Sequence, residues 1–194
     1  MCIRDSIAGV VVSSGIPAYA GTWDIANGDI TVKGASDESG NYNKVKQGDK
    51  DFEKDEGETV ITGESDKNTV TIDTSGGKVD VTFDDLKIDA SDKGKAAVRV
   101  EGGHDATIEL DGDNKLKSGS HNAGLEKNGN ESSGKLTIKD DNDTKGSLTA
   151  KGGEGGGAGI GGGIKSTGSS ITIRGGTIKA VGGSNAAGIG DGAG

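Results

Sequence analysis

Aliphatic and polar residues alternate over short stretches of this chain, for example at 79–83 (VDVTF) and 170–174 (SITIR). A period of two sends the apolar side chains to one face of a β-strand and the polar side chains to the other. No stretch shows the spacing of an amphipathic helix. The pattern therefore predicts an all-β protein.

The alternating stretches recur in four aligned segments, 79–90, 106–118, 135–150 and 170–180. Repeats with a fixed order of apolar positions are typical of solenoid proteins, in which neighbouring repeats stack. We expect equivalent residues to form core columns, with Leu110 inside and Glu109 outside. The predicted columns are Val81, Ile108, Leu136 and Ile171; Phe83, Leu110, Ile138 and Ile173; Ile88, Leu116, Leu148 and Ile178; Ala90, Ser118, Ala150 and Ala180; Ala96, Ala123, Ala158 and Ala187; and Val98, Leu125, Ile160 and Ile189.

Each repeat contains about three short strands joined by turns rich in Gly, Asp, Asn and Ser, which is typical of a right-handed parallel β-helix (β-solenoid). Such a coil adds ~4.8 Å along the axis. Residues 151–194 include 18 glycines, which suits corners that need a positive φ. An antiparallel sandwich is the competing fold, but units of similar size with one strand order favour the solenoid.

The first 20 residues differ in character from the rest of the chain. Residues 1–6 (MCIRDS) resemble a translated sequencing adapter. Residues 7–20 combine an apolar run with Ala18-Tyr19-Ala20, a pattern typical of the end of a secretory signal peptide. We expect cleavage after Ala20, and a buried N-terminal strand is the alternative.

Residues 21–77 fit the repeat less well and are expected to form N-terminal coils and a cap, because an open first coil exposes backbone edges. The charged stretch 47–58 is expected to be a solvated loop. The strands predicted here are 29–32, 59–62 and 70–73. Residues 78–194 are the regular β-solenoid repeats. The last residues, GIGDGAG, stop within a repeat, so we expect the solenoid to continue beyond this fragment.

Composition excludes several classes of function. The net charge is −9, and without a basic patch we expect neither nucleic-acid binding nor attachment to anionic lipid. The single cysteine, Cys2, leaves no disulfide framework and no thiol chemistry in the body of the chain. His104 and His121 lie in polar loops and are expected to be solvated. No segment approaches the ~20 apolar residues of a membrane span.

Two acidic clusters, 111–114 (DGDN) and 140–143 (DDND), could supply the oxygen ligands that Ca²⁺ prefers. The second resembles the start of an EF-hand loop but lacks its closing Glu. Acidic residues that bond their own turns are the favoured alternative. The candidate calcium ligands are Asp111, Asp113, Asp141 and Asp143.

Few residues are suited to sugar stacking or catalysis. Trp23 and Tyr42 are the candidate stacking residues, since Phe83 belongs to a core column. Arg99 and Arg174 are the only arginines beyond residue 20 that could serve a lyase, and both are expected on the surface. No carboxylate pair has a recognisable spacing for glycoside hydrolysis, so we expect no enzyme activity. An outward row of threonines resembles ice-binding solenoids, but it is mixed with charged residues. It contains Thr82, Thr107, Thr137 and Thr172.

Several strings, among them ELDGDNKLKSG, LTIKDDND and GAGIGGG, resemble those of exported β-helical repeat proteins of gut Gram-positive bacteria. Many of those proteins are described as carrying a carbohydrate-binding domain, and the resemblance covers roughly residues 22–194. It implies a surface protein that is secreted or associated with the cell wall, and binding of acidic polysaccharide, with calcium in some relatives.

The sequence thus leaves three functions open. The first is a structural stalk or adhesin-like segment at the cell surface. The second is a carbohydrate-binding module that uses one face of the solenoid, and the third, more remote, is a polysaccharide lyase.

Overall fold

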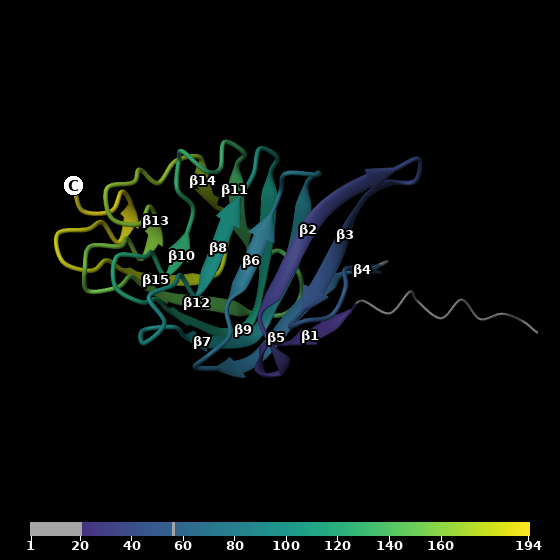
Figure 1. Ribbon diagram of the computed structural model, residues 1–194, viewed down its shortest axis with the longest axis horizontal. Coiled ribbons are helices and arrows are strands. Elements are labelled where there is room, and N and C mark those ends of the chain that lie inside the picture. The colour runs from purple at the N-terminus through teal and green to yellow at the C-terminus, as the bar shows by residue number, and fades with distance from the viewer. Residues whose placement is uncertain (1–20, 56) are drawn as a thin grey trace, which may run out of the picture.

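The computed structural model describes residues 21–55 and 57–194, so the predictions for residues 1–20 lie outside the described residues. The described chain is nearly all β, with two eight-stranded sheets and one short 3-10 helix, η1 (Ile25–Asn27) (Figure 1). Sheet A consists of β1 (Thr22–Asp24), β5 (Thr59–Ser65), β7 (Val79–Asp89), β9 (Ala106–Lys117), β11 (Leu136–Lys139), β12 (Gly146–Lys151), β14 (Ile171–Ile173) and β15 (Thr177–Val181). Sheet B consists of β2 (Ile30–Asp37), β3 (Gly40–Gln47), β4 (Glu53–Asp55), β6 (Val70–Asp73), β8 (Val98–Glu101), β10 (Leu125–Glu126), β13 (Ile160–Gly161) and β16 (Ile189–Gly190).

Strand pairing is parallel through most of both sheets. In sheet A the order is β1-β5-β7-β9-β11-β14, with β12 pairing β9 and β15 pairing β12. In sheet B the order is β16-β13-β10-β8-β6-β2-β3-β4. Within the described chain, the antiparallel strand pairs are β2 with β3 and β3 with β4. Successive strands of each sheet therefore come from successive repeats, as expected for stacked parallel units and not for an antiparallel sandwich.

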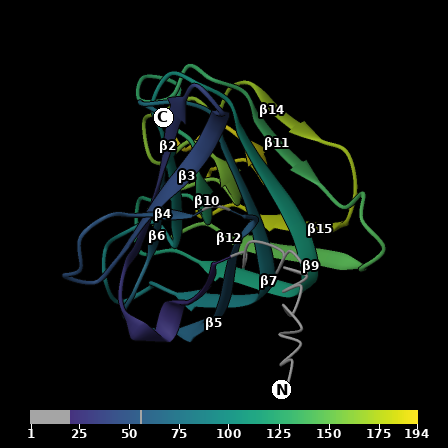
Figure 2. The ribbon, with the colours of Figure 1, turned by 90° about the vertical axis from the view of Figure 1, so that its right-hand side faces the viewer.

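The two sheets enclose one apolar core (Figure 2). Phe83 and Leu110 of sheet A and Ile72 and Val98 of sheet B are fully buried members of the same cluster. Because side chains alternate along each strand, the remaining residues point to the outer faces. The core columns are the main stabilising feature of the described fold.

The predicted sheet B column agrees with the strand register throughout, and the predicted sheet A columns agree with it in part. Val98, Leu125, Ile160 and Ile189 are paired in sequence across sheet B. In sheet A, the first two repeats align as predicted, with Val81 opposite Ile108, Phe83 opposite Leu110 and Ile88 opposite Leu116. The third and fourth repeats also align as predicted.

Between the second and third repeats, however, the predicted register of sheet A is wrong by two residues. Ile138 pairs with Ile108 instead of Leu110, and Leu136 pairs with Ala106. In the next strand Ala150, instead of Leu148, pairs with Leu116. A shift of two residues keeps every side chain on its own face, so the alternating pattern is the same in either register.

The predicted threonine row is divided between the first two repeats, whose register is the predicted one. Thr107, Thr137 and Thr172 are stacked, but their partner in the first repeat is Asp80. Thr82 is opposite Glu109 instead.

The number of strands per repeat changes along the chain. In the first two regular repeats, the two predicted short strands of sheet A are fused into the long bent strands β7 and β9. The bend lies at a bulge, where the segment Asp84–Lys87 is opposite Asp111–Lys115. Asp85 and Gly112 have positive φ values of 52° and 63° there. In the third repeat the corner is longer, and residues 140–145 separate β11 from β12. Three separate strands per repeat therefore occur only in the last two repeats.

The strands predicted in the N-terminal region are observed as parts of β2, β5 and β6, except that Asp29 precedes β2, which begins at Ile30. The prediction that residues 47–58 form a solvated loop is wrong in part, because the stretch contains β4, which pairs with β3. The Asp55 carboxylate is buried and accepts hydrogen bonds from the Gly21 N–H at 3.0 Å and the Trp23 indole at 3.1 Å. A charged edge strand lacks the apolar alternation by which the other strands were predicted.

Candidate functional site

A polar groove of about 760 Å³ crosses the outer face of sheet A. Its floor consists of outward side chains of β7, β9 and β11, which alternate with core residues along each strand. The strand register stacks these side chains in two rows. One row contains Asp80, Thr107 and Thr137, and the other contains Thr82, Glu109 and Lys139. We call this feature the sheet A groove.

Glu109 and Lys139 form the charged centre of the floor. Glu109 is only 7% exposed, although it faces outward, because neighbouring side chains and the loop 140–145 cover it. Lys139 Nζ lies 2.8 Å from Glu109 Oε2 and 2.6 Å from Asp141 Oδ1, and these contacts raise the pKa of Lys139. Glu109 Oε1 also accepts the backbone N–H of Asp141 at 3.0 Å. The pair therefore holds the loop against the groove.

Hydroxyl and amide groups complete the wall near β3. The Thr82 hydroxyl donates a hydrogen bond to Glu58. The Asn43 side-chain amide donates to Thr59 Oγ1 at 2.8 Å and to the Asp80 carbonyl at 2.7 Å. These bonds attach β3 of sheet B to the edge of the groove, where Tyr42 is positioned.

Tyr42, one of the two predicted stacking residues, lines the groove. It is half-buried, and the ammonium groups of Lys54 and Lys44 lie 4.4 Å and 5.9 Å from its ring centroid. An aromatic ring with a hydroxyl at its tip can contact the apolar face of a sugar and bond to its hydroxyls. Tyr42 thus lies in the groove with the Lys54 ammonium over its ring, and its contact with a sugar stays a prediction.

Trp23, the other predicted stacking residue, is not among the residues that line the groove. Its ring packs against the core from β1, and its indole N–H is bonded to Asp55. A side chain held in this way stabilises the start of sheet A. We therefore assign Trp23 a packing role.

The cations of the groove differ in their partners. Lys78 is paired with Asp80 at 2.9 Å, on the wall near β7. Lys135 and Arg174 are exposed and line the groove, and neither has an ion-pair partner among residues 21–55 and 57–194. Two cations are thus accessible to a ligand on the side of the groove nearest β11 and β14.

The two acidic clusters predicted as calcium ligands lie side by side. Asn142 Nδ2 donates to Asp111 Oδ1 at 2.7 Å, which joins 140–143 to 111–114. The carboxylates are engaged by protein groups, since Asp113 pairs with Lys115 at 2.6 Å and Asp141 pairs with Lys139. Asp143 is exposed. Over the described ranges, no group of three or more His, Cys, Asp or Glu side chains is arranged to hold a metal ion.

We therefore expect EDTA to leave the melting temperature of this protein unchanged in low-calcium buffer. The ammonium of Lys115 and the amide of Asn142 already occupy the oxygens of Asp113 and Asp111 that calcium would need. Thermal unfolding followed by circular dichroism, with and without EDTA, measures this directly. A fall in the melting temperature that added calcium reverses, and magnesium does not, would contradict the expectation.

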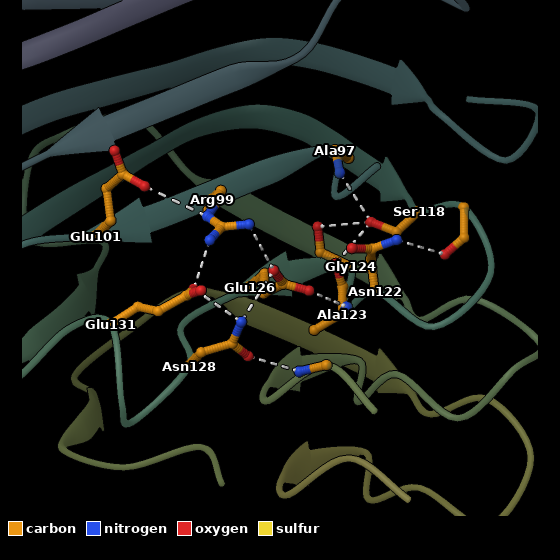
Figure 3. Close-up of polar contacts among 12 residues, drawn as sticks. Ala97, Arg99, Glu101, Ser118, Asn122, Ala123, Gly124, Glu126, Asn128 and Glu131 are labelled. Atoms are coloured by element: carbon orange, nitrogen blue, oxygen red, sulfur yellow. Dashed lines mark hydrogen bonds and ion pairs between the residues drawn. The ribbon is translucent and has the colours of Figure 1, made fainter. Parts of the chain in front are cut away.

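Arg99 lies on the outer face of sheet B between three carboxylates (Figure 3). Its guanidinium nitrogens are 2.6 Å from Glu131, 3.4 Å from Glu101 and 3.6 Å from Glu126. The Asn128 amide donates to Glu126 at 3.2 Å and to Glu131 at 3.0 Å. Burial raises the pKa of Glu126. Because the protein's own acids engage Arg99, its role is to connect β8 and β10 to the following loop.

Sequence reasoning missed Glu109 and Lys139. The predicted register places Glu109 opposite Thr137, which conceals the ion pair. In the observed register the two residues are direct neighbours. An acid and a base at equivalent positions of adjacent repeats would have indicated this ion pair in the sequence.

Comparison with protein-family models, with curated proteins and with solved structures finds no match to this chain. No helix among the described residues is long and apolar enough to cross a membrane.

Proposed function

We propose that the sheet A groove binds an acidic polysaccharide, and that the chain is a β-helical module of a secreted or cell-wall-associated protein. The observation that carries this proposal is the groove itself. Its volume is within the range of ~300–1,000 Å³ that ligand sites occupy. Its floor presents hydroxyl, carboxylate and ammonium groups in register, which can bond to the many hydroxyls of a glycan.

The direction of the groove suits an extended polymer. It crosses several parallel strands that are spaced ~4.8 Å apart, which is close to the length of one sugar ring along a glycan. Tyr42 lies at the β3 side and Arg174 follows β14, so a bound chain would cross the strands between them. Repeated polar rows then offer each sugar a similar set of contacts.

The preference for an acidic polymer rests on Lys135 and Arg174. A guanidinium can bind a carboxylate through two parallel hydrogen bonds, and such charge-assisted bonds are stronger than neutral ones. Lys78 and Lys139 already have carboxylate partners in the protein. The two unpaired cations are therefore the groups available to a uronate.

We also propose that the two sheets are faces of a right-handed parallel β-helix with about three strands per coil. The parallel register of β7, β9 and β11 in one sheet, and of β8, β10 and β13 in the other, supports this architecture. The same regular stacking favours the second candidate function, a rigid stalk or adhesin-like segment. A lyase remains the remote alternative, with Arg174 as the basic residue in the groove.

Binding of the full chain to polygalacturonate, with a neutral glucan beside it, tests the groove. We expect binding to the uronate polymer and a loss of about tenfold in affinity for Arg174→Ala, since a charged hydrogen bond contributes ~1.5–3 kcal/mol. Lys179→Ala is the matched control, because Lys179 is an exposed cation of the same repeat that does not line the groove. Isothermal titration calorimetry gives the affinities.

Two outcomes of this titration would count against the groove. Absence of binding to either polymer would leave the stalk as the better description. Equal losses for Arg174→Ala and Lys179→Ala would show that the attraction is a general effect of surface charge.

A further inference from the structure

The chain contains two Asn-Gly dipeptides, Asn27-Gly28 and Asn128-Gly129, in contrasting surroundings. Asparagine followed by glycine is prone to spontaneous deamidation, because glycine has no side chain to hinder attack of its backbone nitrogen on the asparagine amide. In a folded protein the reaction also depends on how firmly the structure holds the amide and the attacking nitrogen. The two dipeptides therefore allow a comparison within one molecule.

Asn128-Gly129 is held at each of the reacting groups. Asn128 is only 9% exposed, and its side-chain amide donates to two carboxylates at 3.2 Å and 3.0 Å (Figure 3). Its Oδ1 accepts the Gly163 N–H at 2.9 Å. The Gly129 N–H, which would be the nucleophile, donates to the Thr167 carbonyl at 2.8 Å. Closing a ring between this amide and this nitrogen would disrupt all four hydrogen bonds.

Asn27-Gly28 lacks these restraints. Asn27 ends the 3-10 helix η1 and is exposed, and its side chain has no hydrogen-bond partner in the part of the chain that the structure describes. The Gly28 N–H donates to the Ile25 carbonyl at 3.4 Å, longer than the typical range of about 2.7–3.2 Å. Both reacting groups can thus rearrange with little loss of hydrogen bonding.

We propose that Asn27 is a site of spontaneous deamidation, and that the fold protects Asn128 from the same reaction. The Gly28 nitrogen attacks Asn27 Cγ, and the new C–N bond closes a five-membered succinimide ring. The Cγ–Nδ2 bond breaks, and Nδ2 leaves as ammonia with the proton of the Gly28 N–H. One water molecule then opens the ring at either carbonyl, which yields aspartate or isoaspartate.

The product changes the turn that connects η1 to β2. Either isomer adds a carboxylate between Asp24 and Asp29, whose own carboxylates accept backbone N–H groups at 2.9 Å and 2.7 Å. Isoaspartate also inserts one extra carbon into the backbone shortly before Ile30, where β2 begins. Asn27 is not among the residues that line the sheet A groove, so this inference does not depend on polysaccharide binding.

Peptide mapping by mass spectrometry, after incubation of the full chain in mildly alkaline buffer, tests this proposal. Deamidation adds about one mass unit to a peptide, and chromatography separates its aspartate and isoaspartate forms. In the folded protein we expect Asn27 to be modified more than about tenfold faster than Asn128, because the hydrogen bonds that must break are at Asn128.

The same incubation in urea provides the reference, since unfolding removes the effect of the structure. Both peptides should then be modified at similar rates. Asn27→Gln is the matched variant, because glutamine would have to close a six-membered ring, which forms far more slowly. The modification at position 27 should disappear in this variant while Asn128 behaves as in the parent. Equal rates at the two sites of the folded protein, or no modification of folded Asn27, overturns the proposal.

Discussion

Leu110→Asp is expected to abolish cooperative folding of this protein. Leu110 is fully buried and pairs with Phe83, which is itself fully buried. Loss of a large side chain from a packed core costs ~2–5 kcal/mol, and an unpaired buried carboxylate adds several more. Because a folded domain has only ~5–15 kcal/mol in reserve, this one change is enough to remove most of the stability.

Urea unfolding followed by circular dichroism measures this effect, with Lys115→Gln as the control. Lys115 lies on the same strand, β9, but its side chain is exposed and its ion pair with Asp113 is on the surface. We expect the control to keep the parent's unfolding midpoint, since exposed ion pairs contribute little. Equal midpoints for Leu110→Asp and Lys115→Gln would show that the core columns are assigned incorrectly.

The alternation of apolar and polar residues is sufficient to predict an all-β chain with stacked repeats. The sheet B column of Val98, Leu125, Ile160 and Ile189 could be predicted in full, because an alanine two residues before each member fixes the alignment. Sheet A has no such marker between its second and third repeats. Alternation specifies the face of each side chain but not a shift by an even number of residues.

The candidate site was harder to predict than the fold. Tyr42 could be proposed because aromatic residues are so few, but its place in the groove depends on Asn43, which bonds β3 to Asp80 and Thr59. That contact joins residues far apart in sequence, and nothing in the local pattern indicates it. Trp23 has the same apparent chemistry, yet Asp55 and the core engage its ring.

Buried polar residues are also difficult to predict from the alternation of apolar and polar residues. Lys127 occupies an inward position next to Leu125 and is fully buried, where burial lowers its pKa. Its ammonium donates to the carbonyls of Ser132 at 2.9 Å and Ser169 at 3.0 Å, which connects two loops through the interior. A lysine in a polar, glycine-rich stretch resembles a surface residue in sequence. Only the tertiary contacts show that it satisfies buried carbonyl groups.

A charge-reversing substitution of Glu109 is expected to have the second large effect on the stability of the fold. Its outward position in the alternation predicts a tolerant surface site, but the structure shows a buried carboxylate beside the Lys139 ammonium. Glu109→Lys would place two ammonium groups together and turn a cation toward the Asp141 N–H.

Breaking a fully buried pair costs ~3–5 kcal/mol, and because the Lys139 side chain is 30% exposed only part of that cost applies here. We expect Glu109→Lys to lower the urea midpoint clearly below that of the parent, while the variant still unfolds cooperatively. Glu109→Gln is the control, since it keeps the side-chain length and the oxygen that accepts the Asp141 N–H at 3.0 Å. Lys139 retains Asp141 as a partner in that variant, so only a small loss is expected. If Glu109→Lys unfolds at the parent's midpoint, Glu109 is solvated and the groove floor is not the ordered charge pair described above.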